Sequence, residues 1–125
     1  MHHVFSIALG GAAGALARYW VGSYVREIWH GSWPLGTLLI NVSGSLLMGM
    51  VFVLIERAQL HPDIRSIFMV GFLGAFTTFS TFSIETVELW ERESASLALA
   101  YALGTTASCV IAAAVGVWIV RNLVS

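Results

Sequence analysis

Uncharged apolar runs of about twenty residues dominate the sequence. Residues 35–55 contain no charged side chain over 21 positions. As an α-helix rising 1.5 Å per residue, this run would be about 30 Å long, which matches the hydrocarbon core of a bilayer. Residues 66–84 and 97–120 are also uncharged, and residues 4–25 carry only Arg18. The sequence therefore predicts an all-α integral membrane protein with four transmembrane helices.

Charged residues are too few to cover a surface that faces water. They make up 10% of the 125 residues, whereas a soluble domain has about 25%. Six basic and seven acidic residues give a net charge of -1, which leaves no basic stripe for a nucleic-acid backbone. We therefore expect a single transmembrane domain over residues 1–125, with lipid as its main surroundings and no nucleic-acid partner.

Residues that carry enzymatic or metal chemistry are scarce within the four runs. Cys109 is the only cysteine, and the four histidines lie outside the runs without the spacing of a helical metal pair. The runs contain no paired carboxylates and no Ser/His/Asp set. The first run also opens without the basic region of a cleaved signal peptide. We expect a retained first helix and no enzymatic activity.

Arginines are divided almost evenly between the two ends of the predicted bundle. With four spans, the N-terminus, the second connection and the C-terminus share one side, which has three arginines. The other side has Arg26 and Arg92, and Arg18 lies within snorkelling reach of it. Two interpretations remain open: a dual-topology protein, or one orientation fixed by another feature.

The third run combines glycines with a dense series of hydroxyl groups. Gly71 and Gly74 lie about one turn apart, and five of the seven residues 77–83 are Ser or Thr. Since glycine weakens a helix, we expect a break in mid-membrane. Its freed backbone groups would be buried in protein or line a watery cavity, where they could hold an ion. The alternative is a bent helix whose hydroxyls bond to its own carbonyls.

Polar residues on the second and fourth runs recur at helical spacing. They are Thr37, Asn41 and Ser45 on the second run, and Tyr101, Thr105 and Ser108 on the fourth. The Asn41 amide either joins two helices or donates to a passing anion. Together with the third run, these stripes predict one polar path across the membrane.

Four other side chains each have more than one interpretation. Phe79 and Phe82, three residues apart, either pack or turn their partly positive ring edges toward an anion. Arg18 either snorkels to the interface or raises the anion concentration at a pore mouth. Glu85 is either an interfacial acid, a partner of the neighbouring hydroxyls or a cation ligand.

Three segments resemble the Fluc (CrcB) family of fluoride channels. They read GGAAGALARY at 10–19, GTLLINVSGSLLMG at 36–49 and GFLGAFTTFSTFS at 71–83. The resemblance implies an antiparallel, dual-topology homodimer with two fluoride pores in the plasma membrane, the inner membrane of a bacterial cell. It also implies a passive channel that lets cytoplasmic fluoride escape and so relieves fluoride toxicity.

The resemblance further implies roles for individual residues. Phe79 and Phe82 would contact fluoride through their ring edges, with Asn41 as a donor beside them. Backbone carbonyls of Gly74 and Thr77, two from each subunit, would hold a sodium ion at the dimer centre. The remaining residues that it assigns to the fluoride path and its vestibule are Ser80, Thr81, Ser83, Thr37, Tyr101, Thr105, Arg18 and Glu85.

The small multidrug resistance transporters are the main alternative, since they have a similar length and span count. Their proton-coupled export of cations resembles competition for a membrane-embedded Glu in the first span. Here that span holds Arg18 and no acid, so its charge has the opposite sign. A small structural subunit is a third class, and it would have no need for the hydroxyl run.

Overall fold

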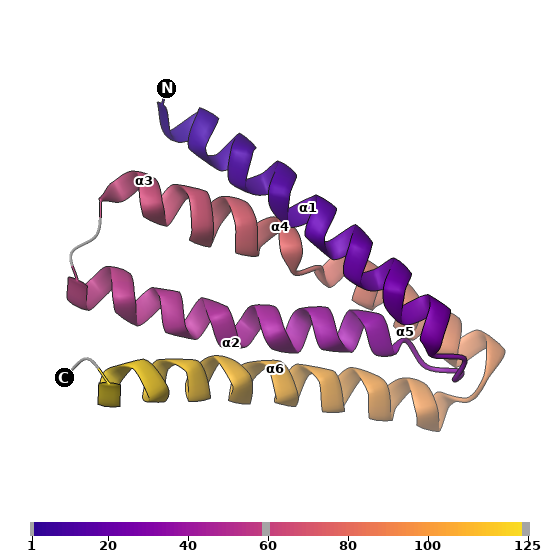
Figure 1. The fold of residues 1–125 in the computed structure, drawn as a ribbon. Helices are drawn as coiled ribbons and strands as arrows, with labels where there is room; N and C mark the ends of the chain where they lie inside the picture. Colours follow the sequence, from indigo (N-terminus) through magenta and orange to yellow (C-terminus); the bar gives the residue numbers. More distant parts are fainter. Residues whose placement is uncertain (1, 59–60, 124–125) are drawn as a thin grey trace.

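The computed structural model describes residues 2–58 and 61–123, and nearly all of them are helical (Figure 1). In chain order the elements are α1 (His2–Ile28), α2 (Leu35–Ala58), α3 (Pro62–Ile64), the π-helix η1 (Arg65–Leu73), α4 (Gly74–Phe76), α5 (Phe79–Arg92) and α6 (Ala95–Leu123). Within this described part, four segments have the length and composition to cross a membrane: His3–Ile28, Leu35–Arg57, Pro62–Arg92 and Ala95–Leu123. The prediction of an all-α protein with four membrane spans is confirmed.

The third span is the longest and extends beyond its predicted limits at both ends. It has 31 residues, whereas a straight helix needs about 20 to cross the hydrocarbon core. Pro62 begins it in the first helical turn, where a missing N–H is tolerated, after His61 as the N-cap. At its other end Glu88 and Glu91 lie on α5, so they form a helical extension of the span and not a loop.

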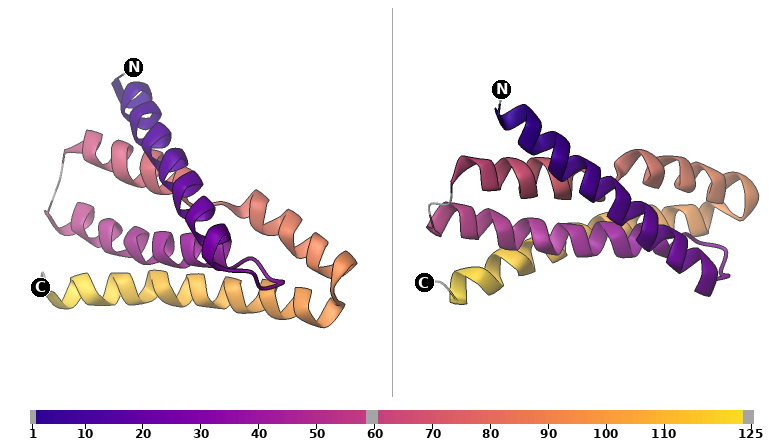
Figure 2. Two further views of the ribbon diagram at one scale, coloured as in Figure 1. Left: turned by 45° about the vertical axis from the view of Figure 1, so that its right-hand side comes forward. Right: turned by 45° about the horizontal axis from the view of Figure 1, so that its top comes forward.

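The two termini and the α2–α3 connection lie at one end of the bundle (Figures 1 and 2). The other two connections lie at the opposite end. α2 packs along α6, while α1 crosses η1 and α4. Arginines at the ends of these elements follow the same division, with Arg57, Arg65 and Arg121 at the terminal end and Arg26 and Arg92 at the other.

Glycines determine how closely the helices approach one another. At Gly10 and Gly14 an added Cβ would overlap backbone carbonyl groups of η1. At Gly71, on the facing helix, it would lie 2.8 Å from a carbonyl oxygen of α1. Gly49 and Gly116 make the same kind of contact between α2 and α6. Small residues therefore pack helices within one chain, as membrane helices commonly do.

A cluster of buried residues lies where α5 meets α6. Its members are Phe82, Leu89, Ala98 and Tyr101, and Trp33 from the α1–α2 connection packs against them. Many large apolar side chains elsewhere, such as Trp118, are exposed. In a bilayer, lipid or a second protein chain would cover those faces.

Candidate functional site

The backbone leaves helical geometry between α4 and α5. Thr77 ends α4 with φ -82° and ψ 155°, and Thr78 precedes α5 with φ -147° and ψ 122°. Both residues are therefore extended. In a continuous helix the Thr78 N–H would bond to the Gly74 carbonyl, so the change of direction deprives both groups of their usual partners.

Asn41 on α2 supplies partners for the extended backbone. Its Oδ1 accepts a hydrogen bond from the Thr78 N–H (2.8 Å), and its Nδ2 donates one to the Thr78 carbonyl (2.9 Å). The Asn41 side chain is 9% exposed. A buried amide that satisfies both backbone groups of one residue is the interhelical contact expected of a polar residue in lipid, and one amide hydrogen stays available.

Several hydroxyls of the third span bond to carbonyls of their own segment. Thr77 donates to the Leu73 carbonyl (2.9 Å) and Ser83 to the Phe79 carbonyl (2.8 Å). Thr78 caps α5 by accepting from the Thr81 N–H (3.2 Å). An extended interruption and back-bonded hydroxyls thus coexist, although the sequence presented them as alternatives.

The two phenylalanines after the interruption have different surroundings. Their ring centroids are 5.5 Å apart, but Phe82 is 8% exposed whereas Phe79 is 76% exposed. Phe82 also contacts the Tyr101 ring, at 5.3 Å between centroids. Phe79 and the neighbouring Ser80 are exposed on this chain, so protein contacts of Phe79 beyond the Phe82 ring must come from another chain.

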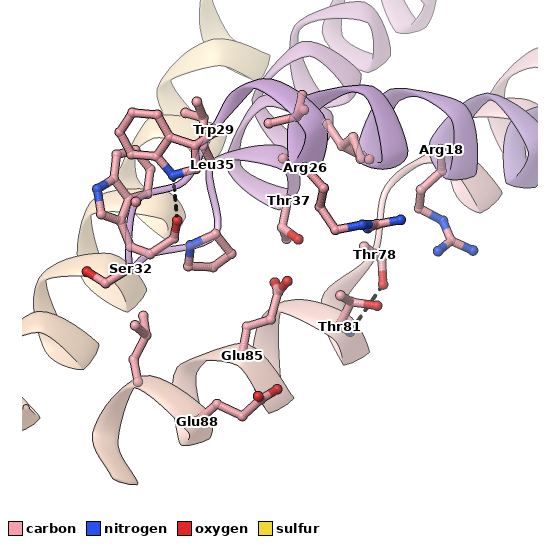
Figure 3. Close-up of a pocket in the computed structure, with 18 of the residues that line it drawn as sticks. Arg18, Arg26, Trp29, Ser32, Leu35, Thr37, Thr78, Thr81, Glu85 and Glu88 are labelled. Atoms are coloured by element: carbon pink, nitrogen blue, oxygen red, sulfur yellow. Dashed lines mark hydrogen bonds between the residues drawn. The ribbon is translucent and has the colours of Figure 1, made fainter. Parts of the chain in front are cut away.

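A cavity of about 640 Å³ opens between α1, the start of α2 and α5 (Figure 3). Four of the predicted site residues line it: Arg18, Thr37, Thr81 and Glu85. Figure 3 shows the Thr37 hydroxyl and the Glu85 carboxylate pointing toward each other across it. Arg18 also donates through Nε to the Ala75 carbonyl of α4 (3.0 Å), which ties the cavity wall to the segment just before the interruption.

Charged side chains of both signs line the cavity. Arg18 and Arg26 come from α1, while Glu85 and Glu88 come from α5 (Figure 3). Arg92 of α5 lines the cavity too and pairs with Glu88 at 3.7 Å. The Arg26 guanidinium is oriented by the Ser23 hydroxyl, to which it donates (3.1 Å). The α1 wall therefore carries only positive charge, which attracts an anion, while the α5 wall carries both signs.

The polar residues of the fourth span line a second hollow. This hollow has a volume of about 300 Å³, and Tyr101, Thr105 and Ser108 contribute to it. The Tyr101 hydroxyl donates to Glu85 Oε1 at 3.4 Å, which connects the second hollow with the first cavity. The predicted stripes therefore meet around Glu85 and Tyr101, while Thr105 and Ser108 lie farther along α6.

Gly74 and Thr77, predicted as carbonyl ligands of sodium, lie at the interruption. Gly74 is exposed on this chain, and its carbonyl is the one that loses the Thr78 N–H. Carbonyl oxygens are hard ligands of the kind that an alkali cation prefers. Among residues 2–58 and 61–123, no three His, Cys, Asp or Glu side chains are placed to hold a metal, so backbone oxygens are the fitting donors here.

Tertiary structure adds contacts that local sequence patterns do not indicate. Arg26 was counted as a charge at one end of the bundle, and it lines the cavity together with Glu88. Trp33, in the connection between α1 and α2, packs against the buried cluster where α5 meets α6. A separation of three residues between Glu85 and Glu88 could have indicated a shared helix face, but no pattern places Arg26 opposite them.

Comparisons with known proteins find a matching family model and similar sequences. The family model described as "CrcB-like protein, Camphor Resistance (CrcB)" matches residues 5–117. A relative from Hahella chejuensis is 42% identical over 120 residues, covering 95% of this chain and 94% of the relative. One from Chelativorans sp. is 40% identical over 124 residues, covering 98% and 99%. Both are named fluoride-specific ion channel FluC.

A relative with the same name is considerably longer. The protein from Methylococcus capsulatus is 49% identical over 121 residues, which cover 96% of this chain and 53% of the relative. The chain thus spans about half the length of that relative and nearly all of the other two.

Proposed function

The chain belongs to the CrcB family, and from this premise we propose that it is a passive, fluoride-selective channel of the plasma membrane. It is a multi-pass membrane protein and not an enzyme. Cytoplasmic fluoride would leave the cell through this channel, down the electrochemical gradient. This export would relieve the toxicity of fluoride. The family decides against the small multidrug resistance alternative.

The polar interruption within an apolar span is the observation that carries this proposal. Thr77 and Thr78 leave the helix, Asn41 bonds to both backbone groups of Thr78, and hydroxyls lie on either side. Irregular backbone is tolerated at membrane depth only where protein or a watery path surrounds it. Fluoride is small and strongly hydrated, so a selective path must replace its water with several neutral donors.

The cavity between α1 and α5 fits the entrance of such a path. The positive charges of Arg18 and Arg26 would raise the local anion concentration there. Hydroxyls of Thr37 and Thr81 would then exchange for water around the ion. The ring edges of Phe82 and Phe79, the free amide hydrogen of Asn41, and the hydroxyls of Ser80 and Ser83 would continue the path beyond the entrance.

Two chains are needed to enclose this path. Phe79 is 76% exposed, and Ser80 and Ser83 are exposed too, so one chain leaves this part of the proposed lining uncovered. Gly74 is exposed as well. A second copy in the opposite orientation would cover these residues and yield two pores. The even division of arginines between the ends of the bundle supports an antiparallel, dual-topology homodimer.

A sodium ion at the dimer centre is part of the proposal. The carbonyls of Gly74 and Thr77 from each chain would hold it, and it would offset the repulsion between anions in two neighbouring pores. Thr77 keeps its hydroxyl bonded to the Leu73 carbonyl, so only its backbone oxygen is offered. Backbone carbonyls would thus hold the sodium ion, and side-chain donors would stay available to contact the anion.

Fluoride release from liposomes tests the function directly. Purified protein in vesicles loaded with potassium fluoride should release fluoride once valinomycin relieves the charge build-up, as read by an ion-selective electrode outside. The release should not depend on a pH gradient, because no donor in the path needs to change protonation. Vesicles that are loaded with potassium fluoride but contain no protein (empty vesicles) are the control.

Two results would contradict a fluoride channel. One is release no faster than from empty vesicles. The other is uptake of a cationic drug driven by a proton gradient, which an exporter of the multidrug class would show and a passive anion channel would not.

A further inference from the structure

Trp33, in the short connection between α1 and α2, lies between two hollows of the protein. It lines the 640 Å³ cavity and also the 300 Å³ hollow. Among the described residues it is the only one common to both linings. The indole therefore stands between two spaces that both contain residues of the proposed fluoride path.

The connection around Trp33 is held in one arrangement by several contacts. Trp29 Nε1 donates to the Trp33 carbonyl (2.9 Å), which Figure 3 shows as a dashed line from the Trp29 indole. The two rings meet edge to face, with centroids 5.2 Å apart and planes at 64°. An added Cβ at Gly31 would lie 2.6 Å from Trp29 Cε2. The absence of a side chain at this position lets the Trp29 ring fold against the connection.

Trp33 also packs against the buried cluster of Phe82, Leu89, Ala98 and Tyr101. Two members of that cluster belong to the proposed path, since Phe82 offers a ring edge and Tyr101 bonds to Glu85. The indole thus fills the space beside the Glu85–Tyr101 contact. It is also the residue at which the lining of the polar cavity meets the lining of the hollow on α6.

We propose that Trp33 is a specificity-determining wall of the channel, which separates the polar cavity from the hollow on α6 and so keeps the fluoride path narrow. Trp29 is its positioning residue. This inference rests on the proposed function, and it adds a residue that excludes larger anions. A wider opening would favour chloride, because chloride is larger than fluoride and gives up its water more easily.

A graded series at Trp33 tests the wall. Trp33→Phe, Trp33→Leu and Trp33→Ala remove increasing volume from the partition, so the chloride-to-fluoride release ratio from liposomes should rise in that order. For Trp33→Ala we expect a rise of about tenfold, the lower end of what one methylene of mismatch produces in an enzyme pocket. Trp29→Phe keeps a ring against Gly31 but removes the Nε1 donor, so it should give a smaller rise.

Trp118→Ala is the matched control. Its indole is exposed on α6 and lines neither space, so the release ratio should stay at the parent value. If the alanine variant fails to assemble, the comparison of Trp33→Leu with Trp33→Phe decides in the same way.

The outcomes separate this inference from the function on which it rests. If the parent protein releases no fluoride, the channel assignment fails. If the parent releases fluoride and the Trp33 series leaves the release ratio unchanged, or changes it without regard to side-chain size, the wall is overturned while the channel assignment stands.

Discussion

Asn41 is the residue on which the interruption of the third span depends most directly. Its amide presents an acceptor to the Thr78 N–H and a donor to the Thr78 carbonyl at once. A side-chain amide carries an acceptor and a donor on separate atoms of one planar group, without a charge. Asn41 therefore fixes the extended backbone and, with its remaining amide hydrogen, faces the proposed path.

Asn41→Asp should damage both stability and flux. The carboxylate still accepts from the Thr78 N–H but has no donor for the Thr78 carbonyl, and it adds a negative charge to an anion path. We expect a loss of about 1–3 kcal/mol in stability, read by thermal unfolding in detergent, together with loss of fluoride release. Ser43→Ala is the control, because Ser43 bonds only to carbonyls of its own helix. An Asn41→Asp protein with the stability of the parent would show that Asn41 does not hold the extended backbone at Thr78.

Substituting each phenylalanine separates anion contact from packing. Phe82→Ile removes a buried ring from contact with Tyr101, so it should lower both stability and fluoride release. Phe79→Ile changes a ring that is exposed on the single chain, so it should lower release while thermal unfolding of the dissociated chain stays unchanged. Parent release rates from both variants, with assembly intact, would make the two rings packing residues.

Arg26 should act through its charge. Arg26→Gln should slow fluoride release at low ionic strength, and the deficit should shrink as salt is raised, because the Debye length falls from about 30 Å at 0.01 M to about 10 Å at 0.1 M. Arg26→Lys should retain most of the parent rate. A deficit that is equal at both salt concentrations would show that Arg26 supports structure rather than attracting anions.

At the scale of elements, the contact of α1 with η1 brings Arg18 to the interruption. Gly10, Gly14 and Gly71 let the two backbones approach closely, and Arg18, one turn after Gly14, reaches the Ala75 carbonyl (3.0 Å). The packing of two helices thus positions a functional side chain. A change in their separation should therefore affect the cavity as well as stability.

Gly14→Ala tests this coupling. The new Cβ would overlap the Phe72 carbonyl group, so the helices must separate, and we expect a loss of about 1–3 kcal/mol and slower fluoride release. Gly11→Ala on α1 is the matched control, since an added Cβ there would lie 3.9 Å from the Gly71 carbonyl oxygen, an ordinary van der Waals distance, and a helical alanine is favoured over glycine. Equal stability and release in the two variants would contradict a role for the close approach.

The sequence was sufficient for some elements of the fold and not for others. The four spans follow from the apolar runs, because length and lack of charge are local properties. The π-helical turns of η1 leave no trace in the composition. The pairing of Asn41 with Thr78 needs two elements 37 residues apart to meet, and the opposition of Arg26 to Glu85 needs α1 to face α5. Tertiary placement determines such contacts, and local patterns do not encode it.

At the scale of the whole molecule, orientation rests on a small difference in arginines. Three belong to the end with the termini, and Arg26 and Arg92 belong to the other, with Arg18 between. Removing one arginine from either end should therefore bias insertion in opposite directions, because the end richer in Lys and Arg stays in the cytoplasm. The parent chain, in contrast, should insert both ways.

Arg57→Gln and Arg92→Gln form a matched pair for this test. A C-terminal reporter that is active on one side only should label both populations of the parent. With Arg18 counted toward the Arg26 end, to which it can snorkel, each end of the parent has three arginines. Arg92→Gln should then place the termini in the cytoplasm and Arg57→Gln should place them outside, because each variant leaves its own end with two arginines against three. A single orientation in every cell of the parent strain, or no shift in either variant, would rule out dual topology.

Co-expression of the two variants then tests the antiparallel dimer. Each variant alone supplies mostly one orientation, so few antiparallel pairs form and fluoride resistance of the cells should fall below that of the parent. Both variants together supply complementary orientations, and resistance should return, because the exposed Phe79 and Ser80 of one chain again meet a chain of opposite direction. Parallel dimers would be formed by each variant alone, so undiminished resistance in the single strains, given shifted orientations, would refute the antiparallel arrangement.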